Sequence, residues 1–208
     1  MIRHGETAWN AARRLQGHID IALNQEGQRQ ADAMGQALSQ EALAVIVASD
    51  LQRARHTAQA LAQHHGLPVQ SDAGLRERCY GAFEGLLYAQ IAQRYPSHYA
   101  AWQAREIDAV MPAGERESET LRQFYQRSTT AILGWARKYP GQTIAMVAHG
   151  GVLECAYRAA LDLPLDRPRD FPVKNASINR FSVIDGKLKL IDWGDCAHLA
   201  APAIDELA

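Results

Sequence analysis

Two stretches of the chain, Leu43–Ala48 and Thr143–Ala148, are apolar at every position or nearly so. Short apolar runs of this kind are typical of strands that are covered on both faces of a sheet. Each is followed by a segment of helical composition. For the segment after Leu43–Ala48, Ser49 predicts an N-cap and Gly66 predicts the helix end. The segments with helical composition are 24–38, 51–64, 118–138 and 151–161. Strands that alternate with helices predict a mostly parallel sheet with helices on both faces.

Two further features complete the predicted fold. Asp185-Gly186 separates the runs 177–184 and 187–193, and an Asp-Gly pair between alternating runs predicts an antiparallel hairpin. Residues 86–140 interrupt the alternation of strands and helices, and we interpret them as a helical lid insertion. We therefore predict a single α/β domain over residues 1–208. Its architecture is a three-layer α/β/α sandwich with a mostly parallel central sheet, an antiparallel edge hairpin and the helical lid.

Composition and charge exclude several classes of protein. Hydrophobic residues make up 47% and charged residues 22% of the 208 positions, as in an ordinary globular protein. The formal net charge of −1 gives no global field that would attract nucleic acid or a membrane surface. We see neither a signal peptide nor a membrane-spanning stretch, and Cys79, Cys155 and Cys196 form no CxxC pair. Reduced thiols and a cytoplasmic location are the expectation.

A His-Gly pair follows each of two predicted strands. His4-Gly5 comes at the start of the chain and His149-Gly150 comes directly after Thr143–Ala148. Because ligands gather beyond the carboxyl ends of parallel strands, both imidazoles are expected at one edge of the sheet. Only Met1 and Ile2 precede Arg3, so we expect a few residues to be missing before Met1.

Cations and a carboxyl group are expected beside these histidines. Arg3 adjoins His4, and Arg53 lies in the first turn of the helix after Leu43–Ala48. A guanidinium suits phosphate because its planar fork donates two hydrogen bonds and stays charged. His4 is then a candidate nucleophile and Glu77, in a loop, a candidate proton donor. Each residue alone has an ordinary structural explanation, and only their combination indicates phosphoryl transfer.

These residues belong to motifs that resemble one known family. The motifs, in chain order, are Arg3-His4-Gly5-Glu6-Thr7 with Trp9-Asn10, Gln16-Gly17, Ser49-Asp50-Leu51-Gln52-Arg53-Ala54 with Thr57, Leu75-Arg76-Glu77, Tyr80-Gly81-Ala82-Phe83-Glu84-Gly85, and Ala148-His149-Gly150-Gly151. The chain resembles the histidine phosphatase superfamily, the phosphoglycerate-mutase-like group. The first motif alone is moderately specific, whereas all of them in this order are highly specific.

The resemblance implies a role for each motif residue. His4 is implied as the nucleophile that is phosphorylated, and Glu77 as the general acid and later the base that activates water. The other implied site residues are Arg3, Arg53 and His149 in the phosphate pocket, Asn10 and the Gly150 backbone at the phosphate oxygens, and Gln16 and Gly17 at the pocket mouth. The resemblance implies no cofactor and no metal.

The family contains phosphatases and bisphosphoglycerate-dependent mutases, and the predicted lid favours a phosphatase. The segment 86–111 is short, and its cations Arg94 and Arg105 are mixed with Tyr95, Tyr99 and Trp102. A mainly apolar, aromatic lid suits a small metabolite with one phosphate. The stretch 113–118 departs from the family's usual Gly-Gly-Glu-Ser, which leaves the lid contacts there undefined.

Three alternatives to a phosphatase stay open. The first is a phosphoglycerate mutase, and the second is a phosphate-ligand-binding protein without catalysis, for which Glu77 would not be needed. The third makes His4 and His149 metal ligands, although no HxH or HExxH spacing accompanies them. The edge hairpin 177–193 also suggests a possible homodimer.

Overall fold

The computed structural model describes residues 1–205, and its centre is a six-stranded sheet in the order β3-β2-β4-β1-β5-β6. The strands are β1 (Ile2–Arg3), β2 (Leu43–Ala48), β3 (Val69–Ser71), β4 (Thr143–Ala148), β5 (Ile178–Ile184) and β6 (Lys187–Asp195). The first four run parallel to one another, whereas β5 is antiparallel to both β1 and β6. The predicted parallel centre with an antiparallel edge hairpin is confirmed.

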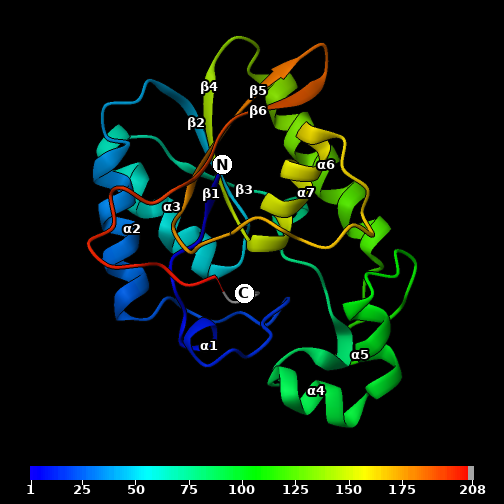
Figure 1. Cartoon of the computed structure of the whole chain (residues 1–208). Helices are drawn as coiled ribbons and strands as arrows, with labels where there is room; N and C mark the ends of the chain where they lie inside the picture. Colours follow the sequence, from blue (N-terminus) through cyan, green and yellow to red (C-terminus); the bar gives the residue numbers. More distant parts are fainter. Residues whose placement is uncertain (206–208) are drawn as a thin grey trace.

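Helices cover both faces of this sheet, as Figure 1 shows. Helices α2 (Gln25–Ala37) and α3 (Gln52–His65) lie on one face, and α6 (Leu121–Lys138) and α7 (Gly150–Leu161) lie on the other. Side chains alternate along β2, so that Ile46 packs in the α2–α3 core while Val47 packs in the α6–α7 core. This two-sided burial explains why the β2 run has no polar position.

The segment of residues 84–120, which precedes α6, forms a separate layer below the sheet in Figure 1. Its helices are α4 (Tyr88–Arg94) and α5 (Pro96–Gln103), and two 3-10 turns, η1 (Ala73–Leu75) and η2 (Gly81–Phe83), precede them. Phe83, Ile91 and Met111 form its core, against which Tyr95 and Trp102 pack. Pro96 divides the aromatic stretch into two helices because proline disfavours a helical conformation in the residue before it. Of the predicted lid segment, α4 and α5 form this layer, whereas α6 packs against the sheet with α7.

Helix ends differ from the sequence prediction in two places. Ser49 is not the N-cap of α3, which begins at Gln52, and its hydroxyl accepts instead from the Leu51 N–H at 3.3 Å. The carboxylate of Asp20 accepts from the Gln52 N–H at 2.7 Å and takes over the capping role. Gly66 ends α3 in the left-handed conformation, as predicted, with φ 63°.

The strand β3 and the start of α6 were not foreseen. β3 is a short edge strand whose Gln70 and Ser71 are exposed, so it lacks the apolar pattern that marks β2 and β4. Helix α6 starts at Leu121, with Thr120 as its N-cap. Ser118 does not cap it, because its hydroxyl accepts from the Met111 N–H and donates to the Met111 carbonyl, both at 2.9 Å.

Candidate active site

Parallel pairing of β1 with β4 brings the two His-Gly pairs together. Arg3 lies opposite Ala148 in the register, and the His4 N–H donates to the Ala148 carbonyl at 3.0 Å. The imidazoles of His4 and His149 lie edge to face, with ring centroids 5.1 Å apart and an interplanar angle of 61°. Residues separated by most of the chain therefore share one buried corner at the carboxyl end of the sheet.

The hydrogen bond of the His4 ring selects its tautomer. Nδ1 lies 2.7 Å from the Gly5 carbonyl, which only accepts, so Nδ1 carries the proton and Nε2 keeps its lone pair. Burial, followed by the nearby charges of Arg53 and Arg3, holds the pKa of His4 well below its usual range. The ring is neutral at neutral pH and is suited to act as a nucleophile through Nε2.

Backbone carbonyls fix the two arginines beside this ring. Arg53 Nη2 donates to Gly17 at 2.8 Å and Nη1 donates to Ile19 at 3.0 Å, while Arg3 Nη1 donates to Val173. Both side chains are almost fully buried. Guanidinium groups that are held this rigidly form a preorganised positive site for an anion.

His149 stands at the N-terminus of α7 as its N-cap residue. Both ring nitrogens are buried, and no other residue of the described chain is within hydrogen-bonding distance of them. Burial, followed by the charges of Arg53, His4 and Arg3, lowers the pKa of His149 well below its usual range. A neutral imidazole with an N–H free to donate complements the dipole of the helix N-terminus at an anion site.

Glu77 faces the same site from the loop after η1. Its Oε2 accepts from the Gly151 N–H at 3.0 Å, and its Oε1 accepts from the Arg78 N–H at 2.7 Å. A Cβ atom at position 151 would lie 2.3 Å from Oε1 and 2.9 Å from the Phe124 ring. Glycine at this position therefore lets the carboxyl group reach the first turn of α7.

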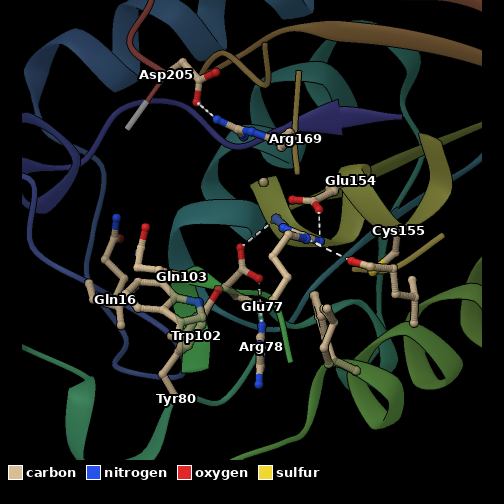
Figure 2. A pocket seen from close by; sticks show the side chains of 18 of the residues that line it. Gln16, Glu77, Arg78, Tyr80, Trp102, Gln103, Glu154, Cys155, Arg169 and Asp205 are labelled. Atoms are coloured by element: carbon tan, nitrogen blue, oxygen red, sulfur yellow. Dashed lines mark hydrogen bonds and ion pairs between the residues drawn. The ribbon is translucent and has the colours of Figure 1, made fainter. Parts of the chain in front are cut away.

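A cavity of about 670 Å³ opens onto these groups. In the view of Figure 2, Glu77 lies between the Arg169–Asp205 pair on one side and Tyr80, Trp102 and Gln16 on the other. Among the predicted site residues, those that line the cavity are Arg3, His4, Gln16, Gly17, Arg53, Glu77 and Gly150. The cavity thus joins the positive corner to the aromatic layer formed by α4 and α5.

Two predicted residues do not line the cavity. His149 is fully buried beside His4, and Asn10 is fully buried in α1 (Ala8–Ala11). Oδ1 of Asn10 accepts from both the backbone N–H and the hydroxyl of Thr7, at 2.9 and 3.0 Å, in a capping box. In the structure this amide orients the turn that follows His4.

The sequence analysis missed the arginines and acids on the outer wall of the cavity. They are Arg78, Arg105, Glu154, Arg158 and Arg169, with Asp205. Glu154 joins two of them, through Arg105 at 2.5 Å and Arg158 at 2.8 Å. The apolar run of α7, broken on one face by Glu154 and Arg158 at i,i+4 spacing, was the available signal for a buried ion pair.

Residues 1–205 contain neither a metal-binding cluster nor a membrane-spanning helix. Among residues 1–205 no group of three or more His, Cys, Asp or Glu side chains is arranged to hold a metal ion. Within the same part of the chain, every helix is too short or too polar to span a bilayer.

Several known proteins resemble this chain over most of its length. Phosphoglycerate mutase-like protein 4 of Arabidopsis thaliana is 39% identical over 205 residues, covering 96% of this chain and 85% of that protein. The metal-independent phosphoserine phosphatase of the same plant is 35% identical over 203 residues, covering 97% of this chain and 82% of that protein. The structure of YhfR from Bacillus stearothermophilus superposes with a TM-score of 0.85 at 32% identity, covering 95% of this chain and 96% of that one. The model of the histidine phosphatase superfamily (branch 1) matches residues 1–196, and the chain belongs to that family.

Proposed function

We propose that this protein is a metal-independent phosphatase that hydrolyses a small phosphomonoester through a phosphohistidine at His4. One observation carries the proposal: the neutral His4 ring, with Nε2 unprotonated, lies beside His149 in a corner fixed by Arg3 and Arg53. Glu77 lines the same cavity as that ring. Nucleophile, positive donors and proton source are thus within one site, as phosphoryl transfer requires.

The proposed reaction has two displacements. In the first, Nε2 of His4 attacks phosphorus, the bond from phosphorus to the ester oxygen breaks, and Glu77 gives its proton to the leaving alcohol. In the second, Glu77 takes a proton from water, the oxygen of that water attacks phosphorus, and the P–N bond breaks to release phosphate and neutral His4. Arg3, Arg53 and His149 donate to the phosphoryl oxygens, whose charge they stabilise throughout.

The remainder of the cavity suits an organic group attached to the phosphate. Tyr80 and Trp102 meet at 5.6 Å between ring centroids and offer an apolar surface. Arg78 is buried, and no described residue accepts a hydrogen bond from its Nη2. A buried donor of this kind favours an oxygen acceptor on the substrate. The cavity volume of about 670 Å³ lies in the range of sites that enclose whole metabolites.

The cysteines and the edge of the sheet bear on location and partners. We propose a cytoplasmic location, supported by three free cysteines, Cys79, Cys155 and Cys196. A second copy of the chain is the proposed macromolecular partner, at the edge strand β6. No nucleic acid or membrane partner is proposed.

A trapping experiment tests the mechanism. The protein is mixed with a ³²P-labelled aryl phosphate and quenched in alkali or acid. We expect a label that is stable in base and labile in acid, absent in His4→Ala and retained in His56→Ala, whose histidine is exposed on α3. Unchanged turnover by His4→Ala would reject the mechanism.

The mutase alternative needs its own assay. With 3-phosphoglycerate and a trace of 2,3-bisphosphoglycerate, we expect inorganic phosphate as the main product. Isomerisation that outpaces phosphate release would instead assign the chain to the mutases.

A further inference from the structure

An arginine outside the cavity is bonded to the loop that carries Glu77. Arg127, on α6, donates through Nη1 to the carbonyls of Gly74 and Arg76, each at 3.0 Å. Its Nη2 donates to the carbonyl of Glu77 itself at 3.1 Å. One guanidinium thus donates to three backbone carbonyls within the irregular segment 74–77. One of these carbonyls belongs to Glu77, the proposed acid.

A single carboxylate fixes that guanidinium in turn. Glu119 accepts from Arg127 Nε and Nη2 through its two oxygens, both at 2.7 Å, in a bidentate pair. Burial raises the pKa of Glu119, but the bonds from Arg127 and the Cys79 N–H outweigh it and keep the pKa below its usual value. Glu119 is therefore ionised at neutral pH.

Glu119 also holds the loop on the far side of Glu77. Its Oε2 accepts from the Cys79 N–H at 2.9 Å, and its backbone carbonyl accepts from Arg78 Nε at 2.9 Å. Arg127 and Glu119 together therefore bond to the chain both before and after Glu77. The pair is only partly buried, with side-chain exposures of 25% and 21%, and neither residue lines the cavity.

Helix α6 also supplies a wall beside the carboxyl group. The Arg127 guanidinium lies over the Phe124 ring, 5.2 Å from its centroid, and Phe124 lines the cavity next to Gly151. The helix that fixes the backbone of Glu77 thus also limits where its side chain can go.

We propose that Arg127 and Glu119 are positioning residues that hold the Glu77 carboxyl group in register with the leaving oxygen. This inference rests on the proposed role of Glu77. Neither residue touches the substrate, and their contribution is confined to the proton-transfer geometry. A carboxyl group displaced by about 1 Å donates its proton poorly although the phosphate corner stays intact.

This role has a kinetic signature that a loss of stability lacks. A general acid contributes about 10²–10⁴-fold when the leaving group is a poor one, such as an alkoxide, and far less when it is an acidic phenol. Loosening Glu77 should therefore lower kcat/KM for alkyl phosphates about 10²-fold, and kcat/KM for 4-nitrophenyl phosphate by a small fraction of this loss. A general weakening of the fold would lower both equally.

The test is kcat/KM across a series of phosphomonoesters whose leaving groups differ in pKa. We use kcat/KM because it reports only the steps up to formation of the phosphohistidine, whereas kcat also contains the second displacement, in which Glu77 serves every substrate alike. The test variants are Arg127→Leu, Arg127→Lys and Glu119→Gln. Glu77→Gln is the reference, and Arg122→Leu is the control. Arg122 is on the same helix and pairs with Asp108 at an exposed position. We expect a steeper dependence on leaving-group pKa for Arg127→Leu and Glu119→Gln, a partial effect for Arg127→Lys, and the wild-type slope for Arg122→Leu. The double variant Glu77→Gln/Arg127→Leu should be no slower than Glu77→Gln.

The outcomes separate this inference from the proposed function. If Glu77→Gln leaves the slope unchanged, the assignment of the acid fails and this inference fails with it. If Glu77→Gln steepens the slope but Arg127→Leu and Glu119→Gln reduce all substrates equally, only the positioning role is overturned. Glu119→Gln retains both side-chain size and Arg127, so it decides the question if Arg127→Leu does not fold.

Discussion

At the scale of single residues, Gly151 shows how little room surrounds the proposed acid. A methyl group there would overlap Glu77 Oε1 at 2.3 Å and approach the Phe124 ring at 2.9 Å. Because the ring is held by packing, the carboxyl group must move. We predict that Gly151→Ala lowers kcat for alkyl phosphates at least tenfold. The matched control is Gly134→Ala on α6, where a methyl meets nothing within 4 Å. It should add about 0.5–1 kcal/mol to the free energy of unfolding.

The two buried histidines predict a specific pH dependence of stability. Their folded pKa values lie well below the usual 6.5, so the unfolded chain binds protons that the folded chain does not. The free energy of unfolding is therefore highest above pH 6.5. It falls as the pH drops below 6.5, by up to about 1.4 kcal/mol per pH unit for each histidine. Urea denaturation between pH 7.5 and 5 checks this, and His149→Asn should reduce the slope. A flat profile in this range would contradict the prediction.

Sequence motifs identified the residues of the proposed phosphate corner but not those that support them. His149 and Arg53 follow strands that are recognisable as apolar runs, whereas only Met1 and Ile2 precede Arg3 and His4, so the place of His4 beside them was predicted from its His-Gly pair. Glu119 and Arg127 carry no such mark, because each resembles a solvated charge on a loop or helix. The positioning role that we propose for them needs α6 to dock against the loop after η1, which depends on tertiary packing. Asn10, by contrast, stands out in the sequence as part of a motif, and in the structure its amide oxygen accepts a hydrogen bond from the Thr7 N–H.

At the scale of elements, a partly buried ion pair attaches the aromatic layer to the sheet and its helices. Arg105 follows α5 with a positive φ of 55°, donates to the Leu165 carbonyl at 2.8 Å, and pairs with Glu154 on α7 at 2.5 Å. We predict that Arg105→Ala leaves the sheet intact but loosens α4 and α5. Proteinase K should then cut between residues 104 and 118 several times faster, while Arg116→Ala, at an exposed position in the same loop, should be cut as the wild type is. Equal cleavage of both variants would show that the pair does not attach the layer.

The predictability of the elements depended on burial. β2, β4 and the β5–β6 hairpin were predicted because apolar runs or an Asp-Gly turn mark them. β3 was missed because it is short and two of its three residues are exposed. Pro96 divides the aromatic part of the predicted lid into α4 and α5, a division that the sequence analysis did not predict. The capping error at Ser49 has a similar origin, since Asp20, a residue far from α3 in sequence, bonds the first turn.

At the scale of the whole molecule, the free edge of the sheet predicts self-association. β6 has no further strand beside it within residues 1–205, and Ile191 on this strand is 65% exposed while Ile184 at the hairpin is 55% exposed. Unpaired edges with apolar side chains favour pairing with another strand. We predict that light scattering gives twice the 23.0 kDa mass of the chain, and that Ile191→Lys gives the monomer mass. A wild-type monomer at high concentration would contradict this prediction.

The place of β1 in the sheet has a consequence for biosynthesis. β1, which precedes His4, is made long before β4 and β5, its neighbours in the sheet, and the His4 carbonyl accepts from Asn175 Nδ2 at 3.0 Å. A nascent chain that does not yet include β5 (Ile178–Ile184) therefore has the proposed nucleophile but no enclosure for it. Phosphorylation of His4 during translation would report the moment at which β4 and β5 leave the ribosome and pair with β1.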